Sequence, residues 1–126
     1  YMDEIDVFGY SLAAAPNGIQ PYIRTFKIIE IKADLQSYQV PNVVDQAMKY
    51  VDWVSMTRAG GDYGQVEAYI VAKDFDRELL HYAKEQAIRR YVIPHRPYST
   101  KEWNNLKLIR YRLTGAKPAL EFEVMA

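Results

Sequence analysis

Residues 26–34, Phe-Lys-Ile-Ile-Glu-Ile-Lys-Ala-Asp, are the stretch that most constrains the fold of this chain. The isoleucines favour a β-strand, because branched side chains fit a pleated surface. Since successive strand side chains point to opposite faces, Glu30 and Lys32 share one face while Ile29 and Ile31 line the other. Apolar side chains on both faces are typical of an inner strand that is covered on both sides.

The two charges in this strand each need a partner. An inner strand removes Glu30 and Lys32 from water, which costs solvation free energy unless each charge is compensated. Two partners remain open at this point. One is a bound divalent cation, and the other is a simple ion pair across the sheet.

A second strand is expected to precede this one. Residues 2–10 alternate between polar and apolar side chains, and Pro-Asn-Gly at 16–18 is a strong turn signal before the return strand at 22–33. Asp6 lies opposite Glu30 in this hairpin if the numbers of paired residues sum to 36. That register requires a three-residue loop or a β-bulge, because a slip of one residue reverses the faces.

The rest of the chain predicts alternating helices and strands. Apolar spacing of three and four residues indicates a helix over 43–56 and a second from Asp74 or Asp76 to about Tyr91. Short strands are expected at 66–72, 106–113 and 119–124. A strand–helix–strand unit implies a parallel pair, so the chain is expected to be α/β, a mixed sheet with helices packed on it.

Composition sets broad limits on this fold and its partners. The 126 residues fit one domain, and we expect a piece lacking an upstream segment because the chain opens on Tyr1. Sixteen basic and sixteen acidic residues give no net charge that would indicate a nucleic-acid partner. The absence of cysteine excludes disulfides and cysteine zinc sites, and fits a reducing, intracellular compartment such as the cytoplasm. No apolar run has membrane-spanning length, so no membrane partner is expected.

The predicted hairpin brings together groups that fit a metal site. Carboxylates of Asp6 and Glu30 one strand apart repel each other and attract a hard cation such as Mg²⁺, which prefers oxygen ligands. The carbonyl of Ile31 is a candidate third ligand, and Glu4 on the face of Asp6 is a candidate accessory acid. Lys32 beside the cation is suited to orient or deprotonate water, or to neutralise charge in a transition state.

These residues resemble a known signature. Ile-Asp-Val at 5–7 and Ile-Glu-Ile-Lys at 29–32, on the two strands of a hairpin, resemble the PD-(D/E)-x-K motif of restriction-endonuclease-like nucleases. The next helix carries Gln46 and Tyr50, which match the Gln-x-x-x-Tyr element of the RecB-like and archaeal mismatch-type branches. The likeness covers roughly residues 2–92, although the proline that often precedes the first acid is missing.

The resemblance implies a three-layer, restriction-endonuclease-like core with helices on both faces of a mixed sheet. It also implies a metal-dependent nuclease that hydrolyses phosphodiester bonds in DNA, most simply an endonuclease. Asp6, Glu30 and the Ile31 carbonyl would hold Mg²⁺, with Mn²⁺ able to substitute, and Lys32 and Gln46 would act in catalysis. Tyr50 would be an accessory residue.

Further expectations concern partners and alternatives. A rim of basic side chains is expected to contact phosphate: Lys49, Arg58, Lys73, Arg89, Arg90, Lys107, Arg110 and Arg112. A homodimer, or a place in a larger multidomain protein, fits the resemblance, as does a prokaryotic, viral or plasmid origin. The main alternative is a catalytically inactive domain of the same fold that binds nucleic acid or protein. Another is a small interaction module with an ion-paired sheet face, and RNA is the alternative substrate.

Overall fold

The computed structural model of the chain describes residues 5–14, 22–32, 40–93, 99–114 and 119–125. Two helices and seven strands account for most of them, with one short 3-10 helix. In chain order they are β1 (Val7–Ala13), β2 (Tyr22–Lys32), α1 (Val40–Thr57), η4 (Tyr63–Gln65), β3 (Val66–Ala72), α2 (Arg77–Gln86), β4 (Arg89–Val92), β5 (Thr100–Trp103), β6 (Leu106–Thr114) and β7 (Ala119–Val124).

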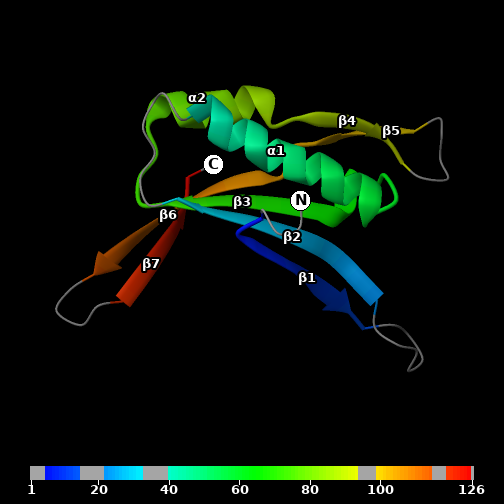
Figure 1. Cartoon of the computed structure of the whole chain (residues 1–126), viewed down its shortest axis with the longest axis horizontal. Helices are drawn as coiled ribbons and strands as arrows, with labels where there is room; N and C mark the ends of the chain where they lie inside the picture. Colours follow the sequence, from blue (N-terminus) through cyan, green and yellow to red (C-terminus); the bar gives the residue numbers. More distant parts are fainter. Residues whose placement is uncertain (1–4, 15–21, 33–39, 94–98, 115–118, 126) are drawn as a thin grey trace.

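Five strands form one mixed sheet in the order β1-β2-β3-β6-β7. The inner strands β2, β3 and β6 run parallel, and β1 and β7 pair antiparallel with them at the two edges. Strands β4 and β5 form a separate antiparallel ribbon. The sheet curls, with β1 and β7 bending away from the helices (Figure 1). The predicted α/β class and the parallel pair around the first helix are therefore confirmed.

The β1–β2 hairpin has the register that brings Asp6 opposite Glu30. Val7 pairs with Ile29, so the numbers of paired residues sum to 36 as far as Ser11. The register then shifts between Ser11 and Leu12, and Leu12 pairs with Ile23. One of the two devices that this register required, a β-bulge, is thus present, while the turn at 16–18 lies outside the described residues.

Helix α1 covers the sheet because its apolar positions recur at three- and four-residue spacing. Val44, Ala47, Val51 and Val54 are buried against β2 and β3. The helix is followed by Gly61, whose φ of 88° lies in the left-handed region that favours glycine, and whose amide donates to the Ser55 carbonyl. Within the described ranges, neither helix has the length and apolar character needed to cross a membrane.

The second helix is shorter than the sequence predicts. Helix α2 begins after the Asp76 cap and ends at Gln86, and residues 89–92 form strand β4 instead of continuing the helix to Tyr91. The apolar residues at 87, 88 and 91 fit helical spacing, yet the β-branched and aromatic run around Tyr91 pairs with β5. Strand β5 was not predicted. Tertiary pairing therefore overrides the helical pattern here.

Both described helices lie on the same face of the sheet (Figure 1). Side chains of β2 and β3 that point toward them are buried, whereas Ile31 on the opposite face is 52% exposed. The expected helices on both faces are thus not seen, and the described residues form two layers. The open face carries Lys27 and Glu67 between its isoleucines, which makes it less costly to expose than an apolar pattern alone suggests.

Candidate functional site

Asp6 and Glu30 meet at the start of the β1–β2 hairpin. The Asp6 amide points at Oε1 of Glu30 across 3.4 Å, and the Ile31 amide donates to Oδ2 of Asp6 across 2.9 Å. The Asp6 side chain is exposed, whereas Glu30 is 2% exposed and points toward the helix layer. The pair therefore joins a buried carboxyl group to one that water reaches.

Burial changes the acidity of Glu30. Desolvation, together with the negative charge of Asp6, raises the pKa of Glu30 to about 7, and Lys32 opposes this rise only weakly. Glu30 therefore takes up or releases a proton near neutral pH. An approaching cation would favour its ionised form.

Lys32 follows two residues after Glu30 on the same face, at the end of β2. It is partly exposed. Among the described residues, an ion pair between Glu30 and Lys32 is absent. The amine instead lies near a carboxyl group that needs a compensating charge.

The backbone of Ile31 adds an oxygen on the Asp6 side. A residue of an antiparallel pair turns its N–H and C=O toward the same neighbour, so the Ile31 carbonyl faces the side to which its amide donates. The described residues contain no group of three or more histidine or acidic side chains able to hold a metal ion. Two carboxylates and a carbonyl still fit Mg²⁺, which keeps several waters and often takes only one or two carboxylates from protein.

Gln46 and Tyr50 are joined to each other on α1. Nε2 of Gln46 donates to the Tyr50 hydroxyl across 2.8 Å, and Tyr50 is fully buried while Gln46 is exposed. The spacing of four residues thus places Gln46 and Tyr50 on one face of the helix, and their approach to the acidic site stays a prediction. Among the described residues, Gln46 has no hydrogen bond to Asp6, Glu30 or Lys32. The predicted accessory residue Glu4 lies outside the described residues.

Several predicted basic side chains lie near the same edge of the sheet. Lys32 pairs in register with Ala72, which pairs with Arg110, so the carboxyl ends of β2 and β3 lie beside the middle of β6. A depression of about 380 Å³ at this edge is lined by Lys73, Asp74, Arg110 and Arg112. Carboxyl ends of parallel strands are a common place for ligands.

Other members of the predicted rim are already in ion pairs. Arg89 binds Asp52 through two nitrogens, and Arg90 lies 3.9 Å from Glu102. The two arginines of β6 are also paired, Arg110 with Glu123 and Arg112 with Glu121. A phosphate would have to compete with these carboxylates, so the rim is weaker than its residue count suggests.

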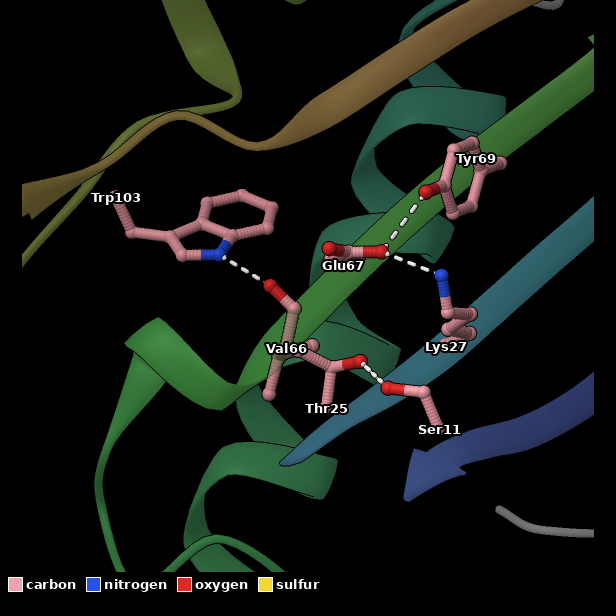
Figure 2. Close-up of polar contacts among 7 residues, drawn as sticks. All are labelled: Ser11, Thr25, Lys27, Val66, Glu67, Tyr69 and Trp103. Atoms are coloured by element: carbon pink, nitrogen blue, oxygen red, sulfur yellow. Dashed lines mark hydrogen bonds and ion pairs between the residues drawn. The ribbon is translucent and has the colours of Figure 1, made fainter. Parts of the chain in front are cut away.

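A polar cluster on the open face of the sheet was not predicted from the sequence (Figure 2). Lys27 donates to Glu67 across 2.9 Å, and the Tyr69 hydroxyl donates to the same oxygen across 2.8 Å. Burial favours a higher pKa for Glu67, but the hydrogen bonds from Lys27 and Tyr69 outweigh it and lower the pKa. The sequence shows only that Glu67 and Tyr69 lie on the same face of one strand. That Lys27 lies beside them follows from the register between β2 and β3.

The polar groups brought together by the hairpin are Asp6, Glu30, Lys32 and the backbone of Ile31. Gln46 and Tyr50 form a separate pair on the helix layer above. The chain matches no protein-family model, no curated protein and no solved structure.

Proposed function

We propose that this protein is a Mg²⁺-dependent phosphodiesterase that cleaves DNA, most simply an endonuclease. The observation that carries the proposal is the apposition of Asp6 with Glu30 and the placement of Lys32 on the face of Glu30. A buried carboxyl group with a pKa near 7, next to a second carboxylate, is poorly explained by stability alone. The substrate class rests on the resemblance to PD-(D/E)-x-K nucleases.

Three protein groups are assigned as oxygen ligands of Mg²⁺. Asp6 keeps Oδ1 available because Oδ2 accepts from the Ile31 amide, and Glu30 and the Ile31 carbonyl supply the other protein oxygens. Mg²⁺ held there would supply charge stabilisation at phosphorus and acidify water. Glu30 must lose its proton to bind it, so binding is expected to strengthen as pH rises through about 7.

Lys32 is assigned to the attacking water or to the charge that builds on phosphate. Its side chain lies at the end of β2, where it reaches solvent, and its positive charge acts on the pKa of Glu30. Gln46 is assigned a positioning role, since its link to the buried Tyr50 limits the rotamers of its side chain.

The second candidate is a non-catalytic domain that binds nucleic acid or protein through this fold. It is favoured by the small number of ligands, because the described residues hold no cluster of three metal-binding side chains. In that case the raised pKa of Glu30 would leave it partly protonated near neutral pH without any cation.

Cleavage assays separate the two functions. Purified protein is incubated with supercoiled DNA, single-stranded DNA and single-stranded RNA, with Mg²⁺ or Mn²⁺. We expect nicking or linearisation by the wild type, and a loss of at least 100-fold in Glu30→Gln and Lys32→Met. Glu67→Gln serves as the matched control, because it removes a partly buried carboxylate from the neighbouring strand on the other face.

The same variants distinguish the roles of the two residues. Lys32→Met should retain metal binding measured by calorimetry, whereas Glu30→Gln should lose it. Equal activity of Lys32→Met and the wild type would refute the nuclease proposal. Metal-independent binding of DNA or RNA without cleavage would favour the second candidate.

A further inference from the structure

The β6–β7 hairpin has one charged face and one apolar face. Arg110 and Arg112 of β6 pair across the hairpin with Glu123 and Glu121 of β7. The other face consists of the cross-strand pairs Ile109–Val124, Tyr111–Phe122 and Leu113–Leu120. Among these, Phe122 is 64% exposed and Leu113 is 72% exposed. An exposed apolar strip of this kind marks an interaction surface.

Strand β7 is also a free edge of the sheet (Figure 1). The Met125 amide donates to the Leu108 carbonyl, which shows that odd-numbered residues here turn their amides toward β6. Because the direction alternates along a strand, Leu120, Phe122 and Val124 turn their N–H and C=O groups outward. In the described part of the chain nothing pairs with this edge.

This edge lacks the usual protection against pairing. Proteins blunt edge strands with charged side chains, especially lysine, with proline or with a bulge. Strand β7 has no lysine, proline or bulge over its six residues, and its two charges, Glu121 and Glu123, are each paired with an arginine of β6. The opposite edge, β1, differs because a bulge interrupts it between Ser11 and Leu12. A long regular partner strand therefore fits β7 better than β1.

The pattern of β7 is complementary to itself. In antiparallel pairing centred on Phe122, that residue faces its own copy, and Leu120 faces Val124 of the second copy. All three outward-facing residues then form hydrogen-bonded pairs, and the apolar faces of both copies join on one side of the sheet. Glu121 faces Glu123 of the second copy, but each carboxylate is already bound to an arginine of its own hairpin.

We propose that two copies of this chain associate through antiparallel pairing of their β7 edges about a twofold axis at Phe122. The pairing creates a continuous ten-stranded sheet, twice the five strands of one copy. Its driving force is the satisfaction of edge hydrogen bonds together with contact between apolar side chains such as the two Phe122 rings. The contact does not depend on the acidic site at Asp6 and Glu30, which lies at the opposite edge of the sheet.

Disulfide trapping tests the register directly, because the chain contains no cysteine. A hydrogen-bonded antiparallel pair has Cα atoms about 5.5 Å apart, which is within the range that a disulfide spans. Phe122→Cys is therefore expected to form a covalent dimer on mild oxidation at micromolar protein. Leu120→Cys is the matched control, since its two copies would lie about 13 Å apart along the strands.

Light scattering across a concentration series gives a second measurement without cysteine. The wild type should have the mass of a dimer and Phe122→Pro that of a monomer, because the amide of residue 122 is not used by β6. Met56→Lys, which charges an exposed apolar side chain on α1, should remain dimeric. A monomeric wild type, or equal cross-linking of Leu120→Cys and Phe122→Cys, would overturn the proposal.

Discussion

The backbone nitrogen of Asp6 lies 3.4 Å from Oε1 of Glu30, and the Asp6 carboxylate binds the next amide along β2. The contact couples the hairpin geometry to the protonation of a buried side chain. The protonation of Glu30 can therefore be followed through the pH dependence of the free energy of unfolding, with or without added metal.

Replacing Glu30 by glutamine is expected to change how stability depends on pH. The pKa of Glu30 is raised from 4.5 to about 7 in the folded protein, so the folded state holds this proton more tightly than the unfolded chain. Stability from this group is present below pH 4.5 and is lost as pH rises to about 7, a change of about 3 kcal/mol in the free energy of unfolding. Glu30→Gln lacks this loss, so it should be the more stable protein at pH 8.

Urea unfolding of both proteins between pH 4.5 and pH 8.5 measures the difference. The advantage of Glu30→Gln should grow through this range and level off above about pH 7. A difference that stays constant with pH would show that Glu30 titrates normally in the folded protein.

Added Mg²⁺ or Mn²⁺ is expected to reverse the alkaline loss of stability in the wild type. A ligand at 100 times its dissociation constant stabilises the folded state by about 2.7 kcal/mol, which raises the melting temperature by several degrees. The effect should be larger at pH 8 than at pH 5, because protonated Glu30 binds a cation poorly. Thermal melts with and without metal measure it, and Glu67→Gln should respond like the wild type. Equal stabilisation of Glu30→Gln would place the cation elsewhere.

Replacing Glu67 by glutamine is expected to have the opposite pH dependence. Its pKa is lowered by hydrogen bonds from Lys27 and Tyr69 despite burial, so its contribution is present at neutral pH and fades as the carboxylate is protonated in acid. Lys27 is partly exposed, which limits the contribution to about 1 kcal/mol. Unfolding of Glu67→Gln and the wild type at pH 7 and pH 3.5 should show a smaller difference in stability at pH 3.5 than at pH 7. A difference that widens in acid would contradict the assignment.

The sequence predicted those parts of the fold whose pattern is local. Strand β2 and helix α1 each carry a single periodicity over ten or more residues, and both are present with boundaries close to those expected. The register of Asp6 against Glu30 could also be predicted. A slip of one residue would reverse the faces of the strand, so this register required a three-residue loop or a β-bulge. The polar cluster of Lys27 and Glu67 required knowledge of which strands are neighbours, and local pattern does not contain it.

Two other differences have the same cause. Tyr91 fits helical spacing from α2, and only its pairing with Lys101 of the unpredicted strand β5 makes it part of a ribbon. Ile31 fits a strand covered on both sides, although its face is open in the described residues. An apolar pattern shows that a side chain prefers to be covered, but it does not identify the segment or molecule that covers it.

Replacing Trp103 by phenylalanine is expected to loosen the β4–β5 ribbon. The indole Nε1 donates to the Val66 carbonyl across 2.8 Å at the start of β3 (Figure 2). The Trp103 side chain is buried, and its ring lies 6.5 Å from that of Tyr63. The variant leaves a buried carbonyl without this donor and also loses packing volume, which together cost about 2–3 kcal/mol in the free energy of unfolding. Urea unfolding measures the cost, and hydrogen exchange should show faster opening of residues 89–92 and 100–103 than of β2. A cost below about 0.5 kcal/mol, with unchanged exchange in the ribbon, would show that Trp103 does not anchor it.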